Sequence, residues 1–442
     1  MFSKLLIPKV IIVLAAAYYI YTPFDISDKS YILNGYTDKM SVYTGDSIDI
    51  FIEPNKDYKK AYFVLYDVLG NRIDTIASPA DKQTINTNYP WSEGFKYHST
   101  FSYTPSDNIE SGIYLWEKKI PFVIKSRKPA DIVIVYPFNT INLYSNAGGK
   151  SFYAYNSSED IASDTLSFER PFTIGLDSYL KDFFLWIGGS EFNVKYVADI
   201  DLDDSSTYNY AKILILAGVS NAWTTKAREN FDNYISNGGN ALILSANTMF
   251  WNVRYNETKD KVIVYKECGN DPIKKDPSCS FNDKNFNIKN SIITNYMYGG
   301  DAQVPNSFQG FKIINDNSPI LKGTNIQNED TLKINNRFVD GLLIQFNNKF
   351  SRKKITILDP GFFKYYRKEI IGVEMAAQED SKKNGVFIIA QKTKKSGIII
   401  NTSSSDWCSS KGIGGKDSLN IRKITSNMIN LLLNEQNVFS PK

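Results

Sequence analysis

A serine lies between a predicted strand and a predicted helix, in a context that suits a nucleophile. Residues 218–222 are Gly-Val-Ser-Asn-Ala, which has the Gly-x-Ser-x-Ala form of a nucleophile elbow. In such an elbow a base takes the proton of the serine hydroxyl, and the oxygen then attacks a carbonyl carbon. The only histidine, His98, lies far earlier in the sequence. Ser220 is therefore a hydrolase hypothesis in which His98, or an Asp or Lys, must supply the base.

The residues around Ser220 predict a strand–helix–strand unit. Residues 213–217 are a continuous apolar run, as in a strand that is buried on both faces. Thr224 or Thr225 caps the helix that follows, and residues 241–244 form a second buried strand. Parallel strands need such a crossover, so the loops that follow the two strands leave the same edge of the sheet. Ligands of open α/β sheets bind at this carboxyl edge.

The composition describes a globular chain of several domains. Its 442 residues are enough for two or three domains, and 42% of them are hydrophobic. The net charge is only +4, which argues against a nucleic-acid surface.

The N-terminal segment, residues 5–22, is the only membrane-type stretch of the sequence. Lys4 precedes it and Lys9 interrupts it, and it is shorter than the roughly 20 apolar residues of a comfortable span. We interpret residues 1–22 as a signal anchor, with a cleaved signal peptide as the alternative. Both interpretations predict an extracytoplasmic protein, either membrane-anchored or secreted, and a cytoplasmic protein with an apolar N-terminus is the remaining alternative.

The three cysteines are compatible with that compartment. Cys268 and Cys279 bracket a polar loop and could close a short disulfide, which would leave Cys408 unpaired. A zinc site is not expected, because there is no second cysteine pair and only one histidine.

Two domains follow the N-terminal segment in the predicted order. Residues 28–125 contain short alternating strands with turn signals between them, which predicts a β-sandwich. A basic, proline-marked link precedes residues 130–437, which we predict to form a flavodoxin- or glutamine-amidotransferase-like three-layer α/β domain. The predicted fold class is therefore α+β multidomain. Within the second domain, residues 137–171 are predicted to be a long loop, and the region from Arg254 to about residue 340 is predicted to be irregular.

An acidic cluster follows the predicted strand at residues 194–197. It contains Asp199, Asp201, Asp203 and Asp204. The cluster lacks the turn glycine and the final glutamate of a calcium-binding loop, so we expect a solvated loop rather than a calcium site.

Ordered matches across residues 30 to 435 resemble the C-terminal domain of the N,N-dimethylformamidase large subunit and its relatives. The family pattern is Gly-His-Asp-Glu-Tyr-Trp, a helix, Gly-Gly-Asn, a strand, and Ser-Gly-Asn-Thr before a Trp and an Arg. The matching residues are Gly218, Trp223, Gly238, Gly239, Asn240, Ser245, Asn247, Thr248, Trp251 and Arg254. The upstream matches include Asn139-Thr140, Gly148-Gly149 and Arg170-Pro171, and the downstream ones include Tyr265-Lys266.

The resemblance implies a site with one iron, held by two tyrosines and a glutamate, with a histidine and an asparagine near it. Phenolate and carboxylate oxygens suit ferric iron, which would polarise an amide carbonyl and lower the pKa of a bound water. The tyrosines correspond to Tyr114 and Tyr144, and the asparagine to Asn247. The glutamate corresponds to Asn221 and the histidine to Val219. A neutral amide and an apolar side chain thus replace an anionic ligand and a proton carrier.

Three functional hypotheses follow from the sequence. The first is a membrane-anchored or exported relative of the large subunit that has a degenerate iron site and binds a small polar ligand through Tyr114, Tyr144, Asn221, Trp223 and Arg254. The second is a hydrolase of linear amides that uses Asn247 with an altered metal site or the Ser220 nucleophile. The third is a structural cell-surface protein. We expect no cofactor, with iron as the alternative, and the resemblance also implies a small second subunit.

Overall fold

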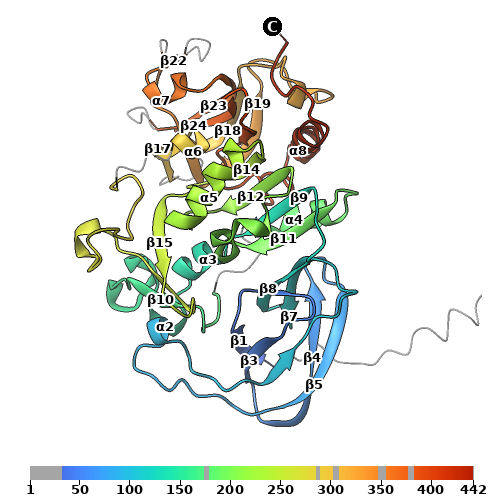
Figure 1. Cartoon of the computed structure of the whole chain (residues 1–442), viewed down its shortest axis with the longest axis vertical. Helices are drawn as coiled ribbons and strands as arrows, with labels where there is room; N and C mark the ends of the chain where they lie inside the picture. Colours follow the sequence, from blue (N-terminus) through green and yellow to red (C-terminus); the bar gives the residue numbers. More distant parts are fainter. Residues whose placement is uncertain are drawn as a thin grey trace, which may run out of the picture.

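The computed structural model describes residues 32–173, 179–284, 289–301, 308–346, 355–376 and 383–441. Figure 1 shows a smaller β-sheet part, in blue, and a larger mixed part that contains most of the helices. The predicted anchor or signal peptide, residues 5–22, lies outside the described residues and stays a prediction. None of the helices in the described ranges is long and apolar enough to cross a membrane.

The smaller part consists of two sheets that share one apolar core. The strands of the first are β1 (Ile32–Thr37), β3 (Ile48–Pro54) and β6 (Phe101–Tyr103). Those of the second, in spatial order, are β2 (Ser41–Tyr43), β8 (Ile120–Lys125), β7 (Gly112–Trp116), β4 (Tyr58–Asp67) and β5 (Arg72–Ala80). Ile50 and Ile52 of β3 belong to the same core as Phe63 and Trp116 of the other sheet. The alternation of apolar residues in β3 predicted this sandwich correctly.

The larger part is built on a nine-stranded mixed sheet. Five parallel strands come first, in the spatial order β11 (Val194–Ala198), β9 (Ile132–Tyr136), β12 (Ile213–Val219), β14 (Asn240–Ala246) and β25 (Ile398–Asn401). Four antiparallel strands continue it: β24 (Asn384–Gln391), β23 (Arg367–Met375), β18 (Phe308–Ile313) and β19 (Thr331–Asn336). The class is mixed α+β, and the flavodoxin-like or amidotransferase-like comparison is not confirmed.

Helices cover both faces of the parallel strands because these strands are apolar on both sides. All residues of β9 and β12 are buried. One face packs against α5 (Thr225–Ser236), and the other against α4 (Lys181–Gly188) and α8 (Ser418–Leu433). The Thr224 hydroxyl oxygen accepts a hydrogen bond from the Ala227 backbone N–H at 2.9 Å, so Thr224 caps α5. The predicted strand–helix–strand unit is therefore present.

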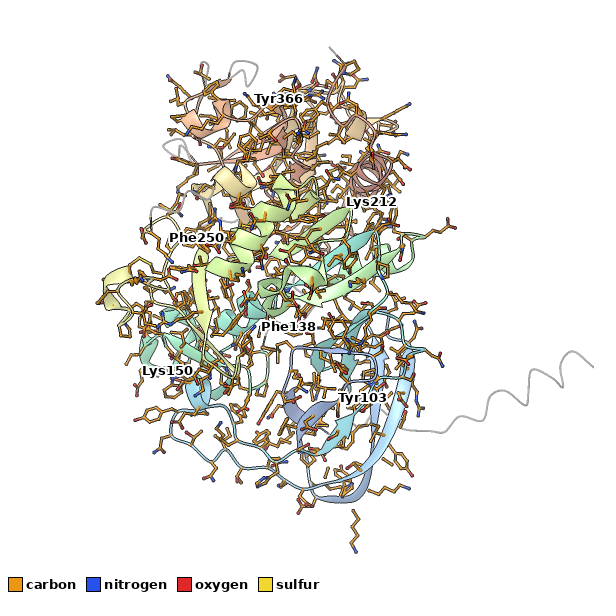
Figure 2. All side chains as sticks on the ribbon, in the orientation of Figure 1. Tyr103, Phe138, Lys150, Lys212, Phe250 and Tyr366 are labelled. Carbon is orange, nitrogen blue, oxygen red and sulfur yellow. A yellow bond between two sulfur atoms is a disulfide. The ribbon has the colours of Figure 1, made fainter. Side chains whose placement is uncertain are left out.

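The segment that we predicted to be a long loop, residues 137–171, contains regular structure. It holds α3 (Phe138–Tyr144), three short 3₁₀ turns and β10 (Thr165–Ser167). Asparagine and β-branched residues give α3 a low intrinsic helix propensity, so the sequence did not indicate it. Burial of Phe138 and Leu143 stabilises the helix instead. Figure 2 labels Phe138 near the middle of the molecule, where this helix begins.

The region after Arg254 is also more regular than predicted. One small sheet has the order β10, β16 (Lys261–Ile263), β15 (Trp251–Tyr255), β13 (Ala222–Thr224). Two-stranded sheets are formed by β17 (Asn295–Asp301) with β20 (Phe338–Gly341) and by β21 (Ile344–Phe346) with β22 (Ile355–Ile357). The remaining helices are single turns: α2 (Pro90–Glu93), α6 (Lys289–Ile292) and α7 (Pro360–Phe363). These strands are short and paired with distant segments, so no local signal marks them.

The acidic cluster joins the two parts and is not a solvated loop. The Asp201 carboxylate accepts hydrogen bonds from the Lys125 ammonium at 2.6 Å and the Ser41 hydroxyl at 2.8 Å, both from the sandwich. Asp199 is buried and accepts from the Asn139 backbone N–H at 2.9 Å, in the first turn of α3. These carboxylates therefore fix α3 and the sandwich relative to the sheet.

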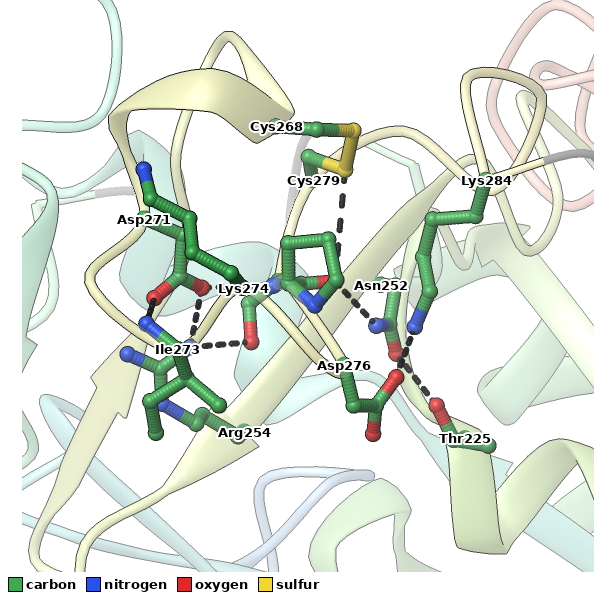
Figure 3. Close-up of polar contacts among 12 residues, drawn as sticks. Thr225, Asn252, Arg254, Cys268, Asp271, Ile273, Lys274, Asp276, Cys279 and Lys284 are labelled. Carbon is green, nitrogen blue, oxygen red and sulfur yellow. Dashed lines mark hydrogen bonds and ion pairs between the residues drawn. A yellow bond between two sulfur atoms is a disulfide. The ribbon is translucent and has the colours of Figure 1, made fainter.

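A disulfide between Cys268 and Cys279 closes the loop that follows β16. Inside this loop the Asp271 carboxylate accepts hydrogen bonds from the Arg254 guanidinium and from the Ser278 backbone N–H, as Figure 3 shows around the bridge. The free thiol, Cys408, is fully buried, and burial raises its pKa.

This pairing predicts the thiol count of the purified, unreduced protein. In the native state no thiol should react with an aqueous thiol reagent, because Cys408 is buried. After denaturation one thiol per chain should react, and after denaturation with reduction all three cysteines should. Three reactive thiols without reduction would contradict the bridge.

Candidate functional site

A cleft of about 400 Å³ opens at the carboxyl edge of the sheet, between β9 and β12. The chain leaves β9 toward β11 on one side and leaves β12 toward β14 on the other, so the connections diverge at this point. Such a divergence opens a crevice in α/β sheets. The lining residues are Pro137, Thr140, Ile141, Tyr144, Asn146, Tyr155, Asn156, Thr173, Tyr179, Leu180, Val219, Arg337 and Phe338. The cleft is thus where the sequence predicted a ligand.

Tyr144, at the end of α3, contributes a phenol to the lining of the cleft. Its ring stacks on that of Tyr153 with 4.4 Å between ring centres. Burial, followed by the neighbouring phenol of Tyr153, holds the pKa of Tyr144 well above its ordinary value. Burial also raises the pKa of Tyr153 to about 12, although the neighbouring Tyr144 hydroxyl lowers it. Both phenols are therefore neutral at physiological pH.

A lysine ammonium lies against the ring cluster behind Tyr144. The Lys266 nitrogen is 3.6 Å from the ring centre of Phe152, 4.0 Å from that of Tyr153 and 4.7 Å from that of Trp251. Burial lowers the pKa of Lys266 to about 8, and Asp164 opposes this shift. The side chain is therefore mainly cationic at pH 7, as contact with ring faces requires.

Asn221 is fully buried beside the cleft, with an unpartnered side-chain amide. The backbone N–H of Asn221 donates to the Thr140 hydroxyl oxygen at 3.0 Å, and the backbone carbonyl of Asn221 accepts from the Trp251 backbone N–H at 2.7 Å. Neither the oxygen nor the nitrogen of the side chain has a hydrogen-bond partner in the described part of the chain. An unsatisfied buried amide costs roughly 1–3 kcal/mol, so Asn221 is a local weakness next to the ligand cleft.

Ser220 is placed as a buried structural residue. Its hydroxyl oxygen accepts a hydrogen bond from the Trp223 indole at 3.0 Å, and the side chain is almost fully covered. No base hydrogen-bonds to this hydroxyl among the described residues, and His98 is exposed in the sandwich part. The strand also differs from the prediction, since β12 continues past Gly218 to Val219 and β13 precedes the helix. A nucleophile elbow would lead directly from strand to helix.

A buried carboxylate that the sequence analysis missed organises the loop after β14. Asp340 accepts hydrogen bonds from the backbone N–H groups of Asn247 at 2.8 Å and Thr248 at 3.3 Å. Asn247 has a positive φ of 55°, and its side-chain oxygen is buried without a partner among the described residues. Burial raises the pKa of Asp340 to about 7 against the effect of these hydrogen bonds. The sequence did offer one signal for this role of Asp340, because an aspartate stands inside the apolar stretch at residues 338–341.

The other predicted site residues lie away from the cleft. Tyr114 belongs to the sandwich core, and its hydroxyl donates to the Glu110 carbonyl at 2.8 Å. Trp223 is fully buried under α5, and Arg254 pairs with Asp271 in the disulfide loop. Of the residues carried over from the resemblance, Tyr144 and Val219 line the cleft, while Asn221 and Asn247 lie behind it.

The side chains at the carried-over positions do not fit a ferric ion. Tyr114 is distant in the sandwich, Tyr144 is a neutral phenol, and Asn221 and Val219 supply no negative charge. The Lys266 cation on the ring cluster would further repel a metal cation. Across the described ranges no group of three His, Cys, Asp or Glu side chains could hold a metal ion.

Comparisons with known proteins identify one family. The family model described as N,N-dimethylformamidase beta subunit-like, C-terminal, matches residues 69–414. This match begins within the sandwich, so it includes both parts of the fold. No curated protein matches the sequence.

Solved structures give only a distant likeness. They include Gan42B, a GH42 beta-galactosidase, and a catalytic mutant of it from G. stearothermophilus. Each is 11% identical with a TM-score of 0.32, and the match covers 69% of this chain and 30% of the other. At this score the likeness carries no argument about fold or function.

The buried Asp340 carboxyl predicts a specific pH dependence of stability. An unfolded aspartate has a pKa of about 4, and the folded pKa is about 7, so the folded state binds more protons between these values. Asp340 should therefore make the free energy of unfolding fall as pH rises from about 4 to about 7. Asp340→Asn, which keeps an oxygen acceptor for Asn247, should lack this component.

Urea unfolding of both proteins across that pH range measures the difference. The matched control is Asp107→Asn, which removes an exposed carboxylate in the sandwich. Parallel pH profiles for wild type and Asp340→Asn would contradict the assignment.

Proposed function

We propose that this chain, which belongs to the N,N-dimethylformamidase beta subunit-like, C-terminal family, binds a small polar ligand in the cleft between β9 and β12. The observation that carries the proposal is the cleft itself, at the divergence of the sheet connections. Its volume of about 400 Å³ lies in the range of small-molecule sites.

The lining of the cleft supports a ligand with both polar and apolar parts. Hydroxyl and amide groups come from Thr140, Asn146, Asn156 and Thr173. The remaining lining is mostly apolar or aromatic. Small-molecule sites combine these features, since apolar walls bury the ligand and a few polar groups orient it.

We further propose that the iron site implied by the resemblance is degenerate here. Asn221 and Val219 stand where the family pattern has a glutamate and a histidine. Without these two groups the Lewis acid would lose an anionic ligand, and the reaction would lose its proton carrier. A binding role needs neither group.

The proposal includes a location outside the cytoplasm. Residues 5–22 would direct residues 23–442 outside the cytoplasm, as an anchor or a cleaved signal. The disulfide between Cys268 and Cys279 supports an oxidising compartment. A small second subunit is part of the proposal through the resemblance alone.

Amide hydrolysis is the second candidate function. It is favoured by the unpartnered side-chain amide of Asn221 and side-chain oxygen of Asn247, because buried polar groups left without partners occur at sites where a substrate supplies them. It is opposed by the burial of the Ser220 hydroxyl. Release of amine from simple amides by the purified chain distinguishes this function from binding alone.

Filling the cleft tests the binding function. Val219 is a lining residue, so Val219→Trp should place an indole in the cleft and weaken the binding of benzamide, a planar polar probe, by tenfold or more as roughly 1.4 kcal/mol is lost. Saturation-transfer NMR and titration calorimetry measure the binding. Leu419→Trp, on the exposed face of α8, is the control and should bind like wild type. Equal binding by both variants would place the probe elsewhere and exclude this cleft.

A double substitution tests the loss of iron. Wild-type protein incubated with ferric iron and desalted should retain well below one iron per chain. Val219→His combined with Asn221→Glu should retain more, because an anionic oxygen and an imidazole join Tyr144. Elemental analysis gives the ratio, and the two single variants are the controls. One iron per wild-type chain together with amide hydrolysis would refute the proposed loss.

A further inference from the structure

Among the described residues that line the cleft, Arg337 is the one that carries a charge. It lies between β19 and β20, where its backbone N–H donates to the Asp406 carboxylate at 2.7 Å. Its guanidinium donates to the Tyr179 hydroxyl at 3.2 Å and lies over the ring of Phe338, with 5.1 Å to the ring centre. The backbone hydrogen bond, the Tyr179 hydroxyl and the Phe338 ring therefore hold the Arg337 side chain at the cleft.

The guanidinium of Arg337 has donors to spare. An arginine side chain has five N–H groups, and the Tyr179 hydroxyl takes one bond from Arg337. Asp301 acts on the guanidinium through its charge, but no carboxylate lies within 4.0 Å of it in the described part of the chain. The charge of Arg337 is thus open to a ligand.

The described lining contains no carboxylate that would oppose an anion inside the cleft. None of its residues is an aspartate or a glutamate, and the charges of Asp301 and Asp406 act on Tyr179 from outside the lining. A guanidinium binds a carboxylate with two parallel hydrogen bonds. One guanidinium balances one negative charge, which favours a monoanion over a phosphate dianion.

The walls beside Arg337 are planar and mostly apolar. Rings from Tyr144, Tyr155, Tyr179 and Phe338 face the cleft together with aliphatic side chains. Aromatic side chains favour stacked or edge contacts with another planar group. A planar apolar body would fill the space that these rings leave.

We propose that the ligand of the cleft is a small monocarboxylate with a planar apolar body, and that Arg337 binds its carboxylate. This proposal rests on the proposed ligand-binding function of the cleft. It names the chemical class of the ligand and the residue that selects it.

Three probes test the proposal by titration calorimetry on the full chain at low and moderate salt. Benzoate has the charge and the ring, benzamide has the ring without the charge, and acetate has the charge without the ring. Wild-type protein should bind benzoate about tenfold more tightly than benzamide, which lacks the charge-assisted hydrogen bonds, and than acetate, which lacks the ring. Added salt should weaken the binding of benzoate alone among the ring probes.

Arg337→Gln should reduce the affinity for benzoate to that for benzamide and leave the affinity for benzamide unchanged. Arg337→Lys keeps the charge without the paired donors and should fall between the two. Arg72→Gln, which removes an exposed arginine from the sandwich, is the matched control and should bind all probes like wild type. Thermal unfolding of each variant verifies the fold.

The outcomes separate this proposal from the one on which it rests. If benzamide binds as tightly as benzoate, or if Arg337→Gln keeps the affinity for benzoate, the carboxylate proposal is overturned and the binding function stands. If none of the three probes binds wild-type protein, the proposed function is overturned together with it.

Discussion

Buried backbone N–H groups at the carboxyl ends of β12 and β14 need hydrogen-bond partners, and this need shapes the whole region around the cleft. The N–H of Ser220 donates to the Ser245 hydroxyl at 3.2 Å, and that of Asn221 to the Thr140 hydroxyl at 3.0 Å. The N–H of Asn247 donates to the Asp340 carboxylate. Side chains from α3, β14 and β20 therefore lock two loops that would otherwise contain unpaired polar groups.

The same constraint gives several residues of the family pattern a structural role. Ser245 and Trp223 hold the loop after β12 through the backbone and hydroxyl of Ser220. Gly218 has a positive φ of 73°, and a Cβ there would approach Leu180 to 2.6 Å. These residues build the shape of the site. Under the proposed loss of iron, the chain would keep this scaffold although reactive positions have changed.

The electrostatics of the region differ from those of a metal centre. Burial keeps the phenol of Tyr144 neutral, the Lys266 cation lies over the ring of Tyr153, and Arg337 lines the same cleft as Tyr144. A ferric ion needs anionic donors, whereas the proposed carboxylate ligand needs the guanidinium of Arg337. The proposed loss of the family's glutamate at Asn221 would also remove a negative charge from this region.

The sequence by itself determined the elements whose signals are local. The buried runs at β12 and β14, the Thr224 cap and the alternation in β3 follow from nearby residues, and so does the cysteine pair across a short loop. Long-range packing decided the rest. Helix α3 exists because its apolar side chains are buried, and Asp340 reaches Asn247 only because β20 passes β14 in space. For the same reason Tyr114 lies in the sandwich core rather than at the cleft, and Arg337 lines the cleft although the sequence did not indicate it. The positions of side chains across a cleft depend on how distant strands pack.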